Sequence, residues 1–332
     1  MEKEEGRESV LSVENLKVSF QDHDKKINAV KGISFSIRSG EIFSIVGESG
    51  SGKSTTCLAI MGLLSKRNGC HREGNIFFKG RNLCKTEEKE MRKIRGKGIA
   101  LILQDSLSAL NPFYRISHQM IAFIRKQRHL SRKEAKAEAV RLLSSLGINE
   151  AEKRIDDYPF QFSGGMRQRV AIAMAIAQSP ELIIADEITS SLDASSANLI
   201  LSILKEINEK TGTSILLITH DLKMAEKFSD RIAVMYSGHI VESAETEFLF
   251  RHPSHPYTRA LIRISDNLRD ERSGLFTTIE GETGLSDNPA LCPFLPRCPE
   301  KERICFKSMP EGKWRDGGYV SCHVAQEKGD ER

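Results

Sequence analysis

The hydrophobic positions of this chain follow two patterns, one typical of strands and one typical of helices. Residues 11–20 and 33–37 place apolar side chains at nearly every second position, which predicts two strands. Residues 42–46 and 182–185 are apolar almost throughout, as expected for strands that are buried on both faces. Residues 214–219 predict a third strand of this buried kind.

Stretches with helical spacing lie between these strands. We expect helices over residues 53–64, over about 194–210, and after Asp221. Strands that alternate with helices predict an α/β fold in which a mostly parallel sheet carries helices on both faces. Ser131 with Glu134 adds a capping-box pattern.

The middle and the end of the chain differ from this alternation. Residues 106–177 read as an inserted helical subdomain. Beyond His252 prolines recur, so we expect only short regular elements there. We therefore predict a nucleotide-binding domain over residues 1–250 and a carboxy-terminal extension over 251–332.

Composition narrows the class of protein. The chain has 332 residues, of which 39% are hydrophobic and 28% charged, and this excludes wholesale disorder. A net charge of +4 does not by itself indicate nucleic acid as a partner. No apolar run approaches the roughly 20 residues that cross a bilayer, and the acidic start shows no secretory signal. We expect a cytosolic, reducing location.

A glycine-rich motif predicts a phosphate site. Residues 47–54, Gly-Glu-Ser-Gly-Ser-Gly-Lys-Ser, fit GxxxxGK[ST] between a buried strand and a helix. The glycines let backbone N–H groups point inward, and the helix start adds partial positive charge. Lys53 would reach the β and γ phosphates, and the Ser54 hydroxyl would bind Mg²⁺. The alternative is a glycine-rich turn that binds nothing.

Two acids end a later buried strand. Asp186 and Glu187 follow residues 182–185, and carboxylates at such a position are costly unless a cation or substrate meets them. Asp186 would belong to the magnesium shell, and Glu187 would orient or deprotonate the attacking water. His220 ends the strand over 214–219, where folds of this class bind ligands, although a lone histidine is more often structural.

Residues 162–169 read Phe-Ser-Gly-Gly-Met-Arg-Gln-Arg and lie before the strand that ends in the two acids. They resemble the signature sequence of the ATP-binding subunits of ABC transporters, and this resemblance implies a P-loop NTPase core of the RecA-like type. Gln104, after a strand over residues 99–103, resembles the Q-loop of that family, residues 191–193 its D-loop, and His220 its switch histidine. Phe20 occupies the position of an aromatic residue that stacks on adenine, or is simply a core residue.

The resemblance implies roles for particular residues of an ATP and Mg²⁺ site. Residues implied to contact ATP are Phe20, Gly47, Glu48, Ser49, Gly50, Ser51, Gly52, Lys53, Ser54, Thr55, Ser163, Gly164, Gly165, Gln168 and Asp193. Catalysis is assigned to Glu187, His220 and Gln104, and Mg²⁺ to Ser54, Gln104 and Asp186. The signature around Ser163 would face the nucleotide of a partner subunit, so that two chains close around ATP and separate after hydrolysis.

Several stretches are more specific to the oligopeptide, dipeptide and nickel importer branch, and two of them resemble its D-type ATPases. These stretches are residues 47–54, 104–105, 111–112, 166–168, 185–187 and 255–261. Ile188 departs from the family, which usually has proline there, and we expect no loss of chemistry from it.

The expected function is that of an ATPase subunit of an importer for oligopeptides or dipeptides. The resemblance implies a second, F-type ATPase as partner, two transmembrane permeases, and an extracytoplasmic substrate-binding protein. The chain would lie peripherally on the cytoplasmic face of the cell membrane. Alternatives are an importer of nickel or a metal chelate, and a soluble ABC ATPase that acts on DNA or ribosomes. The basic cluster over residues 85–97 favours a solvated helix face over a nucleic-acid patch.

Four of the seven cysteines lie near the carboxy end. Cys292, Cys298, Cys305 and Cys322 contain no CxxC pair, so an ordinary zinc ribbon is a poor match. Four thiols in a reducing compartment favour a soft metal centre. Some members of the resembling branch carry a [4Fe–4S] cluster on such a set. The cluster, a zinc ion and free thiols in a packed tail all remain open.

Overall fold

The computed structural model describes residues 8–22, 25–64, 69–104, 110–190, 192–267, 279, 288, 290–315 and 317–330. Its contacts divide the chain into two units, whose bounds differ from the sequence-based division. The P-loop unit contains residues 11–36, 42–84 and 218–332. The helical unit contains residues 1–10, 37–41 and 85–217. The domain boundary near residue 250 stays a prediction.

An antiparallel sheet forms part of the P-loop unit. Its strand order is β2-β1-β4-β5, with bounds Lys25–Arg38, Ser9–Asp22, Cys70–Phe78 and Arg81–Asn82. The register of β1 against β4 shifts between Glu14 and Lys17, where Asn15 has a φ of 46°. This bulge explains why the apolar alternation over residues 11–20 is imperfect, because an extra residue reverses the faces of the strand.

A second run of strands in this unit leads to the P-loop. Strand β3 (Ile42–Val46) pairs in parallel with β9 (Arg231–Tyr236), which pairs antiparallel with β10 (His239–Glu245). Two short strands extend the run from β10, namely β12 (Gly318–Val320) and β11 (Lys313–Arg315). The helices are α1 (Lys53–Ile60), α9 (Leu222–Phe228), α10 (Thr246–Arg251), α11 (Pro256–Asn267) and α12 (His323–Asp330), and the 3-10 turns are η2 (Leu83–Lys85), η4 (Leu295–Arg297) and η5 (Arg303–Phe306).

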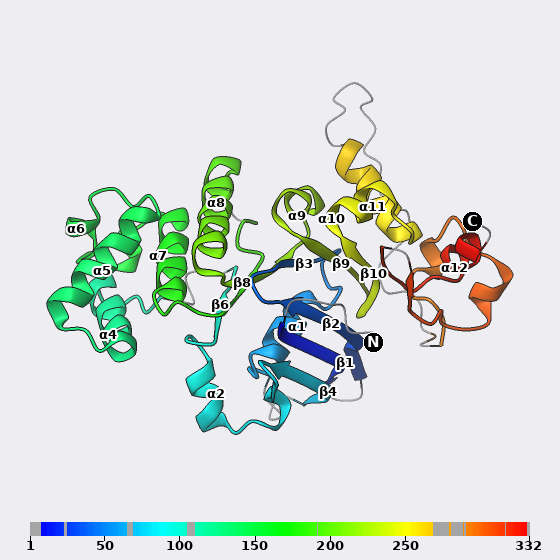
Figure 1. Ribbon diagram of the computed structural model, residues 1–332, viewed down its shortest axis with the longest axis horizontal. Helices are drawn as coiled ribbons and strands as arrows, with labels where there is room; N and C mark the ends of the chain where they lie inside the picture. Colours follow the sequence, from blue (N-terminus) through cyan, green and yellow to red (C-terminus); the bar gives the residue numbers. More distant parts are fainter. Residues whose placement is uncertain are drawn as a thin grey trace. The chain divides into compact units, whose positions relative to one another are not determined.

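The helical unit contains parallel strands and most of the long helices. Strand β6 (Ile99–Ile102) pairs in parallel with β7 (Leu182–Asp186), and β8 (Ser214–Thr219), which begins in this unit, is the next strand. The other elements are α2 (Glu88–Ile94), α4 (Ile116–Arg128), α5 (Arg132–Ser145), α6 (Ala151–Arg154), η3 (Pro159–Gln161), α7 (Gly164–Ile176) and α8 (Ala194–Thr211). Helices α4, α5 and α7 pack together, as Figure 1 shows.

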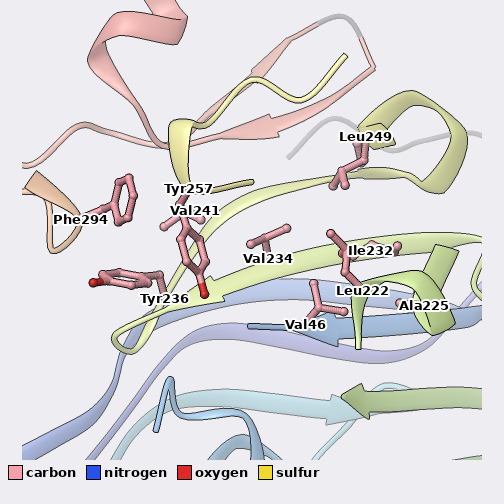
Figure 2. Packing of buried hydrophobic residues seen from close by; sticks show 11 residues of the cluster. Val46, Leu222, Ala225, Ile232, Val234, Tyr236, Val241, Leu249, Tyr257 and Phe294 are labelled. Atoms are coloured by element: carbon pink, nitrogen blue, oxygen red, sulfur yellow. The ribbon is translucent and has the colours of Figure 1, made fainter. Parts of the chain in front are cut away.

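One core of the P-loop unit joins side chains from both sides of residue 250. Figure 2 shows Tyr236, Tyr257 and Phe294 beside one another in this core, which also includes Val46 at the end of β3. The ring centroids of Tyr236 and Tyr257 lie 4.6 Å apart, and those of Tyr257 and Phe294 lie 5.3 Å apart. Such aromatic pairs add about 0.5–1.5 kcal/mol each to the burial itself. The extension is therefore packed against the strand that precedes the P-loop.

Most predicted elements are present, with two corrections. The strands β3, β7 and β8, the capping box at Ser131, and helices α8 and α9 are confirmed. The first helix ends at Ile60 instead of residue 64, because Gly62 adopts φ 62° and ends the helical turn. Only short elements were expected beyond His252, yet α11 has 12 residues, since proline at its first position does not interrupt a helix.

Helix α2 lies within the basic cluster, and several of its cations are paired. Arg95 and Arg92 contact Glu88, and Lys93 contacts Glu90. These charge pairs lie on one helix and make its surface mixed in sign. None of the helices among the described residues is long and apolar enough to span a bilayer.

Candidate functional site

The P-loop depends on two glycines in backbone conformations that other residues adopt with strain. Gly47 has φ 157°, and a Cβ there would lie 2.1 Å from the carbonyl oxygen of Met235. Gly52 has φ 103°, and its Cβ would lie 2.4 Å from the carbonyl oxygen of Ala29. Both contacts are too close for any side chain. The loop therefore takes its turn next to β2 and β9 only with glycine.

The P-loop lysine is buried beneath its own loop. Lys53 begins α1 and is 4% exposed. Its Nζ donates to the carbonyl oxygens of Gly47, at 2.8 Å, and Glu48, at 2.9 Å, and approaches Ser51 Oγ at 3.4 Å. The ammonium thus lies across the loop at a helix start, where its charge adds to that of the helix N-terminus.

Other predicted ATP contacts of this unit lie around the loop. Ser49, Gly50 and Ser54 are exposed, Glu48 and Thr55 are half-buried, and Ser51 is buried. The carbonyl oxygen of Ser51 accepts from the N–H of Gly238, which ties the loop to the β9–β10 hairpin. Phe20 is half-buried near the end of β1, opposite Cys70. His220 is exposed directly after β8.

The structure adds P-loop contacts that the sequence did not predict. The N–H of Glu48 donates to Tyr257 Oη at 3.0 Å. The carboxylate of Glu48 accepts two hydrogen bonds from Arg297, whose Nη1 also donates to Tyr236 Oη. Residues 255–261 were noted only as a branch marker, and Arg297 carried no signal beyond its place among the tail cysteines.

In the helical unit, a serine joins Gln104 to the loop of the two acids. Asp186 is buried at the end of β7, and Glu187 is half-buried next to it with φ 48°. Ser190 Oγ donates to the carbonyl oxygen of Glu187 at 2.9 Å and accepts from Gln104 Nε2 at 2.8 Å. Because the amide nitrogen of Gln104 is held by Ser190, its oxygen is the atom that suits a metal ion.

The signature residues begin helix α7. Ser163 is the N-cap, and its Oγ accepts from the N–H of Met166 at 3.4 Å. Ser163 and Gly164 are exposed, and Gly165 is half-buried in the first turn. Gln168 differs from the others, since its side chain is 1% exposed and donates to the carbonyl oxygen of Ile188. Gln168 thus connects α7 to the loop after β7. The contact of Gln168 with ATP stays a prediction.

Asp193 caps a helix in this structure. Its carboxylate accepts from the N–H of Ser196 at 2.9 Å and from Ser196 Oγ at 2.8 Å, at the start of α8. These hydrogen bonds hold the pKa of Asp193 below its usual range. Ser191 of the predicted D-loop lies outside the described residues.

The four tail cysteines line one small cavity of about 20 Å³, together with His255, Phe294 and Leu295. None of the four forms a disulfide. Burial raises the pKa of Cys292 to about 11, with smaller effects from Cys322, Cys298 and Cys305. In the part of the chain that the structure describes, no group of three or more His, Cys, Asp or Glu side chains is arranged to hold a metal ion. The thiols converge without forming a ligand set.

A buried strand leads into the P-loop and its helix, and a serine caps a second helix that begins with two glycines. These features are typical of an ATP-binding-cassette ATPase. Residues 30–190 match the family described as ABC transporter. More narrowly, the chain belongs to the oligopeptide/dipeptide family of ABC transporter ATP-binding subunits. Residues 241–305 match the C-terminal region of oligopeptide/dipeptide transporters.

Full-length relatives support this assignment. The chain is 42% identical over 325 residues to the dipeptide transport ATP-binding protein DppD of Bacillus subtilis, covering 97% of each chain. It is 38% identical over 315 residues to the oligopeptide transport ATP-binding protein OppD of Escherichia coli, covering 95% of this chain and 93% of the relative. The chain is therefore an ATPase that is coupled to transport.

Solved structures agree on the fold. An ATP-binding cassette solved as a dimer with ADP and Pi is 30% identical, with a TM-score of 0.64 over 71% of this chain and 98% of that one. A component of an ABC transporter complex from Clostridium perfringens is 25% identical, with a TM-score of 0.62 over 78% of this chain and 98% of that one. The predicted fold class is confirmed.

Proposed function

We propose that this ATPase powers the uptake of oligopeptides or dipeptides through two partner permeases. The near-full-length similarity to a dipeptide transport ATP-binding protein carries the substrate class, and the match over residues 241–305 supports it. The chain would act peripherally on the cytoplasmic face of the cell membrane. An extracytoplasmic substrate-binding protein would deliver the peptide.

The P-loop is proposed to hold the phosphates of ATP. Backbone N–H groups at the start of α1 would donate to phosphate oxygens, and Lys53 would neutralise their charge. The present contacts of Lys53 with the loop carbonyls support this role, because they keep the ammonium at the helix start. Phe20 would stack on the adenine.

The proposed function assigns magnesium and the attacking water to particular side chains. Ser54, Gln104 and Asp186 offer only oxygen ligands, the donor set that Mg²⁺ prefers, and the bound ion would neutralise charge on the phosphates. Glu187 would accept a proton from the water that attacks the γ-phosphorus, while the bond from that phosphorus to ADP breaks. His220 would stabilise the same phosphate.

Pairing with a second, related ATPase of the F type is proposed to complete each site. Ser163, Gly164 and Gly165 would bind the γ-phosphate of the partner's nucleotide at the start of α7. The exposure of this helix start supports the role, as does the dimeric state of a solved relative. Asp193 would act across the same interface, whereas Gln168 stays a predicted ATP contact.

Affinity purification of the tagged chain from native membranes tests this function. We expect two permeases and a second ABC ATPase to accompany it, and ATP hydrolysis by the complex to rise when peptide-loaded binding protein is added. An untagged strain provides the control. Stimulation by a nickel chelate instead of peptides would contradict the substrate class. Recovery with ribosomes or DNA, and not with permeases, would contradict transport.

The four tail cysteines are proposed to hold a [4Fe–4S] cluster, with zinc as the alternative. Their convergence on one cavity supports this, because cysteine sulfur is the ligand that both centres use. Since burial keeps the thiol of Cys292 protonated, binding of the centre would release protons.

Metal and sulfide analysis of anaerobically purified protein distinguishes these alternatives. A cluster predicts about four irons and four sulfides per chain, and zinc predicts about one zinc ion. The bound iron and sulfide, or the bound zinc, should fall in a Cys298→Ser variant. The same content should remain in Cys84→Ser, which changes a half-buried cysteine outside the cavity. Metal-free protein in every preparation would leave the thiols without such a role.

A further inference from the structure

One arginine of the carboxy-terminal extension reaches the P-loop. Arg297 ends the turn η4, and its Nη1 and Nη2 donate to Oε2 and Oε1 of Glu48 at 2.9 and 3.2 Å. This is a bidentate contact, which fixes both the direction and the charge of the carboxylate. The two residues are 249 positions apart in sequence.

Further hydrogen bonds hold both Arg297 and Glu48. The side chain of Arg297 is 6% exposed, and its guanidinium also donates to Tyr236 Oη at 3.2 Å and to the carbonyl oxygen of Ile279 at 2.9 Å. The backbone N–H of Glu48 donates to the hydroxyl of the fully buried Tyr257. Tyr236 and Tyr257 belong to the core in Figure 2, so both the arginine and the glutamate are held by packed side chains.

The negative charge of Glu48 affects phosphate binding at the P-loop. Glu48 is the second residue of a loop that takes polyphosphate, and a carboxylate there would repel the ligand. Lys53 contacts the backbone carbonyl of Glu48, whereas Arg297 contacts its carboxylate. Arg297 therefore pairs with the charge of this acid, and it also holds the carboxylate in place.

We propose that Arg297 is a positioning residue of the nucleotide site, which sets the affinity for nucleoside di- and triphosphates by neutralising and orienting Glu48. The inference rests on the proposed role of the P-loop in binding phosphates. It assigns the extension a direct influence on that loop.

Equilibrium titration of the full chain with a fluorescent ATP analogue and with ADP tests the proposal. Arg297→Gln should weaken both by about tenfold, as expected when a half-buried carboxylate loses its partner. Arg297→Lys should weaken nucleotide binding less than Arg297→Gln does, because lysine keeps the positive charge. Adding Glu48→Gln to Arg297→Gln should restore most of the affinity, since the repelling charge is gone. In the partnered complex, KM for ATP should rise while kcat stays within about twofold.

A matched control comes from the same region. Arg259 pairs with Glu300 at 2.5 Å and donates to the carbonyls of Pro253 and Ser254. Arg259→Gln should leave nucleotide affinity unchanged. An equal loss in Arg259→Gln, or no recovery in the double variant, would overturn the role of Arg297. Lys53→Ala should abolish binding, and undiminished binding there would overturn the proposed site as well.

Discussion

Glu187 has a backbone φ of 48°, in the left-handed region that residues with side chains rarely adopt. Two hydrogen bonds support this conformation, because the carbonyl oxygen of Glu187 accepts from the N–H and from the hydroxyl of Ser190. Such strain costs about 1–3 kcal/mol and is concentrated at functional sites. The left-handed conformation ends the extended backbone of β7 at Asp186.

The variant Glu187→Gln keeps the size of this side chain and removes its ability to accept a proton. We expect ATP hydrolysis by the partnered complex to fall by at least about 100-fold, the usual contribution of a general base, while ATP affinity is kept. Phosphate release and nucleotide titration measure the two quantities. Glu181→Gln, at the exposed start of the same strand, is the control. Full hydrolysis by Glu187→Gln would show that another group activates the water.

At the level of elements, helix α11 begins beside two buried titratable groups. His255 Nδ1 accepts from the N–H of Tyr257 at 3.0 Å, so the ring is neutral at that nitrogen. Burial, with a smaller contribution from the charge of Arg259, lowers the pKa of His255 to about 3. The carboxylate of Glu242 accepts from the N–H groups of Ser254 and His255, and burial raises its pKa. The start of α11 therefore depends on an uncharged histidine.

Stability should consequently depend on pH through His255. The pKa in the fold is below the unfolded value of 6.5, so its stabilisation is complete above pH 6.5 and is lost as pH falls towards 3. The loss is about 1.4 kcal/mol for each unit well below 6.5. His239, with a pKa lowered to about 4, acts with the same sign, whereas Glu242 acts with the opposite sign.

A histidine variant isolates this contribution. His255→Asn keeps an acceptor for the N–H of Tyr257 and does not titrate. Between pH 7.5 and 5.5 its free energy of unfolding should therefore fall by about 1 kcal/mol less than that of the parent chain. Urea unfolding at the two pH values measures the difference. His129→Asn makes the same change at an exposed position with φ 54°, where asparagine is tolerated, and should leave the pH dependence as it is. An unchanged slope in His255→Asn would contradict the assignment.

At the level of the whole molecule, the signature and the P-loop belong to different units of one chain. If each signature serves the nucleotide of a partner, a chain that binds ATP without hydrolysing it should accumulate as a closed pair. Glu187→Gln with Mg-ATP, alone or mixed with the related ATPase, should therefore double in mass by analytical ultracentrifugation and return to single chains without nucleotide. Single chains at every concentration, together with full turnover, would contradict the shared site.

Local motifs could be predicted because their geometry lies in neighbouring residues. The P-loop and the start of its helix contain Gly47, Gly52 and Lys53. The helices α7 and α5 are capped by the serines directly before them, Ser163 and Ser131. Strand β7 was visible as an apolar run ending in acids. In contrast, the sequence assigned Gln168 to a nucleotide without showing that its amide is buried against Ile188, 20 residues away.

The sequence alone determined the class of protein, the P-loop, the order of its motifs and the existence of the main buried strands, because backbone preference and hydrophobic spacing act over a few residues. Only the tertiary structure decided which side chains from distant segments meet. It brought Arg297 to Glu48, placed Tyr257 under the P-loop, and gathered four cysteines around one cavity. These contacts depend on how the strands and the extension pack into one core, and no local pattern encodes that packing.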